Sequence, residues 1–283
     1  MVCPLDLQLM RDFMGEDISI IGAGVIGGAI ARCLVRSGSF RRIIATRRRA
    51  EKLKPLSDLG VEVTTDNLRA AREGEIIIIC VKPKDVSGVL RELREAVEGK
   101  LVISTAATIP LSIYRSTAPG ARYVRAMPNI AALVGESFTA YCCDGMITER
   151  DRDVVKRIFE TMGPCEEVEE GYMDAVTGLS GSGPAYIATI IEAMMYAGLK
   201  VGLPRELSLS SSAQAVLGTA KLILEGGLTP SEIKEMVTTP GGTTIEGLYQ
   251  LEDGKVRTAL MRAVEAATEK CTTIRRNWVN EKT

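Results

Sequence analysis

The sequence of 283 residues contains no histidine, so no imidazole is present to act as a general base, a metal ligand or a member of a catalytic triad. Its seven cysteines form no C-x-x-C pair, and their odd number and irregular spacing argue against a disulfide framework and against a zinc site. We therefore expect no metal site, and we expect reduced thiols in a cytoplasmic protein, most of them buried as small apolar side chains.

Excess charge of one sign is also missing. The chain has 35 basic and 36 acidic residues, which leaves no basic field to hold a nucleic acid or an anionic membrane surface. It has no apolar run of the roughly 20 residues that a transmembrane helix needs, and the acidic residues Asp6, Asp12 and Glu16 are unlike a signal peptide. We expect a small-molecule substrate, and neither a nucleic acid nor a membrane as partner.

Signals for strands and helices alternate over the first half of the chain. Short β-rich runs lie at 18–21, 42–46, 61–63, 75–81, 101–104 and 123–127. The run 75–81 is nearly all apolar, which is typical of a strand covered on both faces. The spacing of Ile26, Ile30 and Leu34 predicts a helix over 25–37. This βαβαβ pattern predicts an α/β fold with a doubly wound parallel sheet.

The pattern changes near residue 150, the strand signals fade after Val168, and helical spacing takes over. Helices are predicted at 184–201, 204–224, 230–237 and 254–278. The first of them is apolar almost all round, so it must be buried on several sides. In so small a domain that burial points to a second copy of the chain. We expect an extension at 1–16, a nucleotide-binding domain at 17–170 and an all-α dimerisation and substrate domain at 171–283.

The segment Gly22-Ala23-Gly24-Val25-Ile26-Gly27 has the pattern G-x-G-x-x-G. It follows a predicted strand and opens a predicted helix, which is the context that a dinucleotide site requires. The first glycine permits a tight turn, the second lets a pyrophosphate approach the backbone, and the third lets the helix pack against the strand. The helix N-terminus would then bind the phosphates.

The end of the second predicted strand indicates the kind of dinucleotide. A site for NAD usually has an acidic residue there, but this chain has Arg47 and Arg48 after Thr46. Guanidinium groups suit a 2′-phosphate, so we expect NADPH as the preferred cofactor, with NADH possible. The residues that we assign to the cofactor are Gly22, Ala23, Gly24, Val25, Ile26, Gly27, Arg47, Arg48, Asn67, Val81, Lys82, Pro83, Ala106 and Ala107.

Two glycine-rich stretches, 174–186 and 238–245, lie between the predicted helices of the C-terminal half. The first reads D-A-V-T-G-L-S-G-S-G-P-A-Y and the second T-T-P-G-G-T-T-I. Both have too many glycines for a helix interior, and free amides at a helix start can bind an anion. A tight turn between helices without a ligand is the alternative for each stretch.

With these two stretches, the chain resembles pyrroline-5-carboxylate reductase, the last enzyme of proline synthesis. The resemblance covers about residues 17–276. The resemblance extends to the Val81-Lys82-Pro83, Met127-Pro128-Asn129 and Gly202-Leu203-Pro204 segments. It implies a Rossmann-like domain followed by a helical dimerisation domain, a homodimer or higher oligomer of dimers, and NAD(P)H-dependent reduction of the cyclic imine 1-pyrroline-5-carboxylate to L-proline. Where the family commonly has M-P-N-T-P, this chain has Met127-Pro128-Asn129-Ile130-Ala131.

By the same resemblance, the Pro-Gly-Gly-Thr loop holds the substrate carboxylate and Thr244 contacts the ring nitrogen. The implied substrate-binding residues are Glu170, Thr239, Gly241, Gly242, Thr243 and Thr244, with Thr244 as the catalytic residue. Two alternatives stay open at this point. A β-hydroxyacid dehydrogenase has similar architecture, although no lysine after residue 180 has an asparagine three residues on. A non-catalytic protein that binds NADPH or proline could also use this fold.

Overall fold

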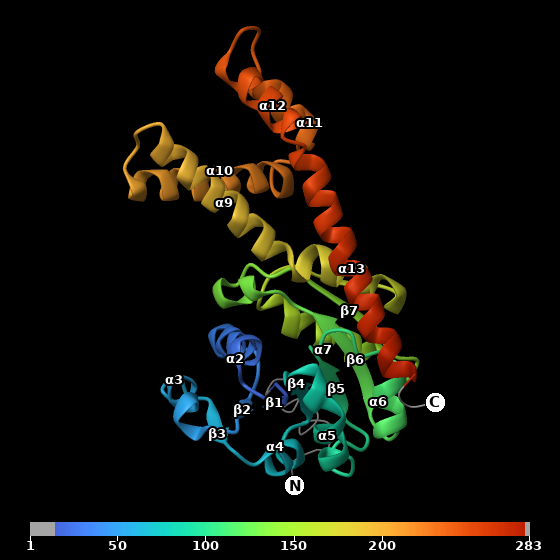
Figure 1. The fold of residues 1–283 in the computed structure, drawn as a ribbon. Helices are drawn as coiled ribbons and strands as arrows, with labels where there is room; N and C mark the ends of the chain where they lie inside the picture. Colours follow the sequence, from blue (N-terminus) through green and yellow to red (C-terminus); the bar gives the residue numbers. More distant parts are fainter. Residues whose placement is uncertain (1–14, 281–283) are drawn as a thin grey trace. The chain divides into compact units, whose positions relative to one another are not determined.

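The structure is a computed structural model that describes residues 15–280. The predicted extension 1–16 therefore lies almost wholly outside the described residues. The chain forms two compact units. The first consists of two segments, one that ends at Gly181 and one that begins at Ala267, and the second comprises Ser182–Ala266. Figure 1 shows the elements of both. No helix within 15–280 is both long and apolar enough to cross a membrane.

An eight-stranded sheet forms the centre of the first unit, with the strand order β3-β2-β1-β4-β5-β6-β7-β8. The strands are β1 (Asp17–Ile21), β2 (Arg42–Thr46), β3 (Glu62–Thr64), β4 (Ile76–Ile79), β5 (Leu101–Ser104), β6 (Arg122–Met127), β7 (Thr139–Cys143) and β8 (Cys165–Glu167). Strands β1 to β6 are parallel, whereas β7 runs antiparallel to β6 and parallel to β8. The doubly wound sheet expected from the sequence is therefore present.

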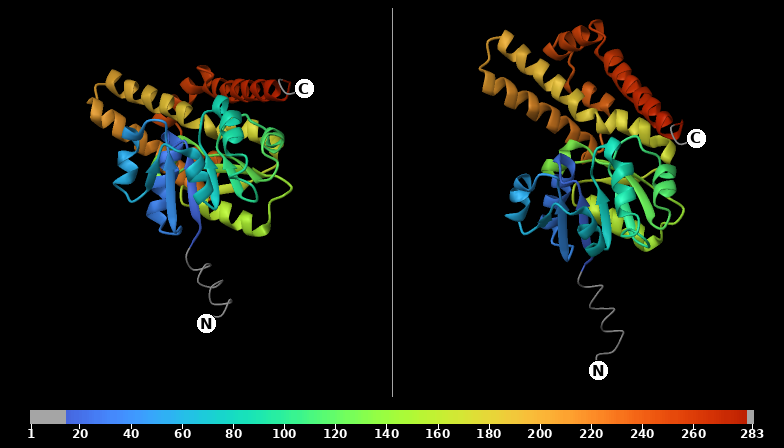
Figure 2. Two further views of the ribbon diagram at one scale, coloured as in Figure 1. Left: turned by 90° about the horizontal axis from the view of Figure 1, so that it is seen from below. Right: turned by 60° about the horizontal axis from the view of Figure 1, so that its bottom comes forward.

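Helices cover both faces of this sheet, as the two views in Figure 2 show. On one face, α2 (Val25–Ser37), α3 (Lys54–Ser57) and α7 (Glu149–Glu160) contribute to one apolar core. On the other, α4 (Asn67–Glu73), α5 (Pro83–Leu93), α6 (Leu111–Thr117) and α8 (Met173–Val176) contribute to a second. Burial on both faces explains why β4 consists entirely of isoleucine and why three of the five residues of β1 are isoleucine.

Strands β7 and β8 were absent from the sequence-based prediction. Strand β8 lies at the edge of the sheet, where Glu166 and Glu167 are exposed, so its sequence has no apolar alternation to detect. Charged residues at an edge strand discourage pairing with another chain. Short 3₁₀ helices connect other elements of the unit; they are η1 (Ala50–Leu53), η2 (Ile130–Val134) and η3 (Glu170–Tyr172).

The glycine-rich stretch 174–186 is helical, which corrects the interpretation of it as a loop with free amides. Helix α8 continues into a π-helical segment, η4 (Thr177–Gly181), and α9 (Gly183–Lys200) follows almost at once. Gly181 lets Met127 pack against this segment, since an added Cβ atom would lie 2.7 Å from Met127 Cε, whereas an added Cβ atom on Gly183 would meet nothing within 4 Å. Close contacts with neighbouring elements have overridden the low helix propensity of glycine.

The second unit consists of α9, α10 (Arg205–Leu224), α11 (Pro230–Val237), α12 (Thr243–Asp253) and the first part of α13 (Val256–Asn280). Helices α9 and α10 pack closely where Gly198 meets Ser208, because a Cβ atom at Gly198 would lie 2.5 Å from Ser208 Oγ. Within 182–266 only Met195, Ser208 and Ser212 are buried in the single chain. The unit thus leaves most of its apolar side chains uncovered.

Candidate functional site

The turn between β1 and α2 has the geometry that a dinucleotide requires. Gly22 has a φ of +93°, in the left-handed region that favours glycine. A Cβ atom on Gly27 would lie 2.7 Å from Gly22 O and 3.0 Å from Cys80 Cβ, so this position cannot hold a larger residue without movement. A Cβ atom on Gly24 would have Gly22 O, at 4.0 Å, as its nearest neighbour, which leaves space for a ligand at the helix start.

Helix α2 begins at this turn without an acid in its first turn and without a side-chain cap on its N-terminal amides. Its first amides therefore face the open space beside Gly24 with the positive end of the helix dipole behind them. This arrangement fits the pyrophosphate of a nicotinamide dinucleotide.

Thr46, at the end of β2, joins the turn to the next element. Its hydroxyl accepts a hydrogen bond from the Gly22 amide (3.2 Å) and donates one to Asn67 Oδ1 (2.7 Å). The Ala23 amide donates to the Thr46 carbonyl at 2.7 Å. Asn67 is the first residue of α4, so these bonds hold three neighbouring elements together on the side where the adenosine end of a dinucleotide would lie. The role of Thr46 was missed in the sequence, which offered only a hydroxyl before two arginines.

The two arginines after Thr46 lie in different environments. Arg47 is half-buried, and its Nη1 donates to the Ala23 carbonyl at 3.4 Å, so its guanidinium lies beside the glycine turn. The side chain of Arg48 is 89% exposed and forms an ion pair with Asp85 on α5 at 3.7 Å. Both arginines thus follow the carboxyl end of β2.

The ends of β4 and β5 complete this edge of the sheet. Burial raises the pKa of the Cys80 thiol to about 12, so Cys80 is neutral and is not a nucleophile at ordinary pH. Lys82 is exposed and precedes α5, whose first residue is Pro83. Ala106 is buried and Ala107 half-buried. Thr108, which follows them, has a φ of +67°, a strained conformation for a threonine and a common mark of a functional edge.

The first unit therefore brings the predicted cofactor residues together along one edge. Gly22, Arg47, Val81 and Ala106 follow β1, β2, β4 and β5, which are adjacent and parallel in the sheet. Direct contact is shown at Gly22, where an added Cβ atom would lie 2.7 Å from Val81 Cγ1. Ligands of open α/β sheets bind beyond the carboxyl ends of such strands.

The predicted substrate loop lies in the second unit and leads into α12. Gly241 has a φ of +70°, and the Gly242 amide donates to the Thr239 carbonyl at 3.0 Å, which closes a tight turn. A Cβ atom on Gly242 would lie 2.4 Å from Thr239 Oγ1, so the turn requires glycine there. Thr243 and Thr244 are the first two residues of α12, and the helix has no side-chain cap on its N-terminal amides.

Glu170 belongs to the first unit, where a backbone amide and an arginine bind its carboxylate. Its Oε1 accepts a hydrogen bond from the Leu111 amide (2.7 Å) and lies 3.5 Å from Arg125 Nη1. A cavity of about 620 Å³ borders Glu170 and the Arg115–Asp144 ion pair.

Arg125 is the centre of a charged cluster that the sequence analysis missed. Its side chain is 1% exposed and lies 3.5 Å from both Glu170 and Asp174. Asp174 in turn accepts hydrogen bonds from Arg275 Nε (2.6 Å) and Thr272 Oγ1 (3.2 Å), both on the returning part of α13. A charged residue in the middle of the apolar run 123–127 was the available signal, because a buried charge needs a partner.

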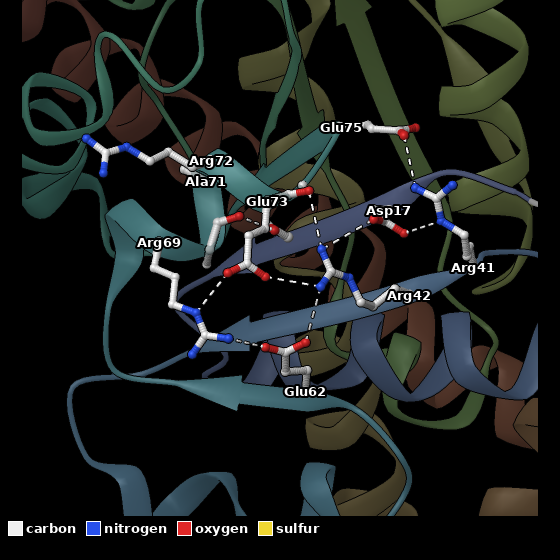
Figure 3. A network of polar contacts seen from close by, with 12 residues as sticks. Asp17, Arg41, Arg42, Glu62, Arg69, Ala71, Arg72, Glu73 and Glu75 are labelled. Carbon is white, nitrogen blue, oxygen red and sulfur yellow. Dashed lines mark hydrogen bonds and ion pairs between the residues drawn. The ribbon is translucent and has the colours of Figure 1, made fainter.

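A second charged network lies at the amino ends of the strands, away from the candidate site. Figure 3 shows Arg41 and Arg42 of this network between Asp17, Glu62, Glu73 and Glu75. The Arg41 side chain donates to Asp17 at 2.8 Å and lowers the pKa of that carboxyl. These pairs join the starts of β1, β2 and β3 to α4, so we assign them to stability. Among residues 15–280, no group of three potential metal ligands is close enough to hold a metal ion.

Comparison with known proteins finds family matches that include residues of both units. Residues 170–274 match the family described as pyrroline-5-carboxylate reductase dimerisation, and residues 17–108 match the family described as NADP oxidoreductase, coenzyme F420-dependent. Among curated proteins, the chain is 44% identical to pyrroline-5-carboxylate reductase of Methanosarcina acetivorans, over 90% of this chain and 96% of that protein. It is 39% identical to the enzyme of Glycine max, over 89% and 94% respectively.

Solved structures agree with these relatives. A pyrroline-5-carboxylate reductase from Coxiella burnetii superposes with a TM-score of 0.85 at 30% identity, covering 92% of this chain and 98% of that one. The Plasmodium falciparum pyrroline carboxylate reductase with NADP bound has a TM-score of 0.85 at 29% identity, covering 93% and 99%. These likenesses favour the imine reductase over the hydroxyacid dehydrogenase and over a protein that only binds its ligands.

Proposed function

Because the chain belongs to the pyrroline-5-carboxylate reductase family and reduces 1-pyrroline-5-carboxylate to L-proline, we propose that its first unit prefers NADPH. The geometry that supports this preference is the pair Arg47 and Arg48 beside the glycine turn, in a place where an NAD site usually has an acid. When bound, the nicotinamide supplies a hydride to the imine carbon. The open space beside Gly24 and the amides of α2 would hold the pyrophosphate, and Ala106 and Ala107 would border the nicotinamide half.

We propose that the loop before α12 holds the substrate. The amides of Gly241, Gly242 and Thr243 lie at or near a helix N-terminus, where backbone donors and the dipole favour a carboxylate. Thr239 shapes this turn through its contacts with Gly242. Glu170, held by Arg125 and the Leu111 amide, is the proposed acidic substrate contact in the first unit.

Reduction of the imine needs one hydride and one proton, together with residues that orient the ring. A cyclic imine is basic and can enter with a proton on nitrogen, so hydride addition to carbon leaves the electron pair on nitrogen and yields the neutral secondary amine of proline. The protein has to orient the ring, and the Thr244 hydroxyl would contact the ring nitrogen. Thr244 is not assigned as a general base, because an unaided hydroxyl is a poor base and the chain has no histidine to activate it.

Thr244→Ala tests this assignment. Losing one hydrogen bond to a charged group costs about 1.5–3 kcal/mol, so we expect kcat/KM for the imine to fall roughly 10- to 150-fold. NADPH affinity should stay the same, because the proposed cofactor residues lie in the other unit. Steady-state kinetics with 1-pyrroline-5-carboxylate and a separate NADPH titration measure the two effects.

Two further variants separate the hydroxyl from the fold. Thr244→Ser keeps the hydroxyl and should retain most of the activity. Thr273→Ala removes a threonine hydroxyl that bonds only its own helix, to the Glu269 carbonyl at 2.9 Å, and should match the parent enzyme. Equal rates for the parent and for Thr244→Ala would refute the proposed role.

The double replacement of Arg47 and Arg48 by alanine tests the cofactor preference. Each charge-assisted hydrogen bond to a 2′-phosphate contributes about 1.5–3 kcal/mol, so NADPH affinity should fall at least about tenfold. NADH affinity should change little, because NADH has no 2′-phosphate. Titration of both cofactors checks this, with Arg150→Ala, an exposed arginine on α7, as the charge control. An equal loss for both cofactors would contradict the assignment.

We also propose that two copies associate through their second units. The exposed apolar side chains there include Ile187, Met194 and Tyr196 on α9 and Leu207 and Leu217 on α10. Exposed apolar surface of this extent is typical of an interface. The matched family is itself described by dimerisation, which supports a second copy as the partner.

A further inference from the structure

Strand β6 and the residues just after it place three side chains against one segment of the chain. Arg125 and Met127 are two positions apart in β6 and share one face of the sheet, and Asn129 follows two positions later, still in extended backbone. Arg125 pairs with Asp174, Met127 packs on Gly181, and Asn129 bonds Ser180. The partners all belong to α8 and η4, the last part of the first unit before the chain passes into the second.

The side-chain amide of Asn129 makes hydrogen bonds to two different elements. Its Oδ1 accepts a hydrogen bond from the Ala131 amide (3.0 Å) and caps the 3₁₀ helix η2. Its Nδ2 donates to the Ser180 carbonyl (3.2 Å) and lies 3.4 Å from Ser180 Oγ. The side chain has this orientation because one neighbour is a donor and the other an acceptor. Of these bonds, only those from Nδ2 join Asn129 to η4, the segment in which the chain leaves the first unit.

Ser180 and Gly181 end the π-helical segment η4. A π-helical turn is rare and is often found at functional sites. It shifts the hydrogen-bond register of the helix, so its conformation depends on contacts from outside. Met127, the last residue of β6, and Asn129, two residues beyond it, supply such contacts, and β6 belongs to the sheet whose carboxyl edge carries the candidate cofactor residues.

We propose that Asn129 is a positioning residue for the reduction: its Nδ2 bonds to Ser180 fix the conformation in which the chain leaves the first unit. Hydride transfer requires the substrate to lie close to the nicotinamide with the correct orientation. The second unit, which carries the proposed substrate loop, begins directly after this segment. The proposal rests on our placement of the substrate loop in the second unit.

Asn129→Asp separates the two sets of hydrogen bonds of this side chain. Aspartate caps a helix as well as asparagine does, so η2 keeps its cap. A carboxylate cannot donate to Ser180, and it repels the Ser180 carbonyl. We expect kcat for the imine to fall at least about tenfold, since a displacement of about 1 Å can cost a hundredfold. The dissociation constant of NADPH should stay within twofold of the parent value.

A purely structural role would give a different result. Thr148→Ala removes the side-chain cap of α7, whose hydrogen bonds are to Asp151 in the same helix, and should lower the urea midpoint without changing kcat. The proposal is overturned if Asn129→Asp keeps kcat within twofold of the parent enzyme. If that variant does not fold, Asn129→Ser keeps a side-chain oxygen that can cap η2 but has no Nδ2 to donate to Ser180, and it should lower kcat with NADPH binding intact; an unchanged kcat there also overturns the proposal. A parent-like Thr244→Ala with an impaired Asn129→Asp would refute the substrate loop alone.

Discussion

Replacing Asp174 by alanine is expected to lower the free energy of unfolding by about 3–5 kcal/mol, the cost of breaking a buried ion pair from one side. The Arg125 guanidinium is 1% exposed, and Asp174 is one of its two carboxylate neighbours at 3.5 Å. Without Asp174, Arg125 keeps only the partly exposed Glu170, and Arg275 loses its bond of 2.6 Å. Arg125 would then be a buried cation with a single carboxylate neighbour.

Urea unfolding at a fixed protein concentration measures this loss, because stability and association are coupled in an oligomer. Asp174→Asn keeps the size of the side chain and should lose less than the alanine variant. Asp153→Ala changes an exposed residue of α7 and should remain within about 0.5 kcal/mol of the parent. A midpoint for Asp174→Ala that equals the Asp153→Ala midpoint would show that the cluster contributes little.

Met194→Asp is expected to separate the copies of the chain. Met194 is 40% exposed on α9, so a single copy can accept a charge there. At an apolar interface the same charge would be buried without a partner, at a cost of several kcal/mol, and association should weaken at least about a thousandfold. Light scattering at micromolar concentration should show a dimer or larger assembly for the parent and a monomer for the variant.

Met146→Asp is the matched control. Met146 belongs to the first unit and is 62% exposed, so the same substitution there should leave the assembly unchanged. Ile190→Asp is a less clean test, because Ile190 is half-buried within its own chain. A parent protein that is monomeric at this concentration, or a Met194→Asp variant that still associates, would contradict the proposed interface.

The parts of the fold that could be predicted from sequence are those where local pattern and packing agree. Helix α2 was predicted with its observed bounds, since its apolar spacing runs from the glycine turn to Gly38, which takes the left-handed conformation that ends the helix. The strands β1, β2, β4, β5 and β6 were found within a residue or two, because burial on both faces makes them apolar.

Where contacts between distant residues determine the conformation, the sequence predicted the wrong structure or none. The glycines at 178, 181 and 183 suggested a loop, yet the segment is helical and is contacted by Met127 and Asn129. The ionic partners Asp174 and Arg275 are about a hundred positions apart, so no local pattern relates them. The candidate site shows the same contrast: its glycine motifs could be predicted, whereas the Thr46–Asn67 bond and the strained Thr108 could not.

The first unit is discontinuous along the chain, and this affects the order of events during synthesis. Asp174 emerges from the ribosome long before Thr272 and Arg275, the residues that hold it from α13. Trp278, which packs against one of the two cores of the sheet, is made later still. A nascent chain can form the sheet early but cannot complete its first unit until the whole second unit has been translated. A gene divided between the two units would therefore yield an N-terminal fragment in which Asp174 lacks its partners Thr272 and Arg275.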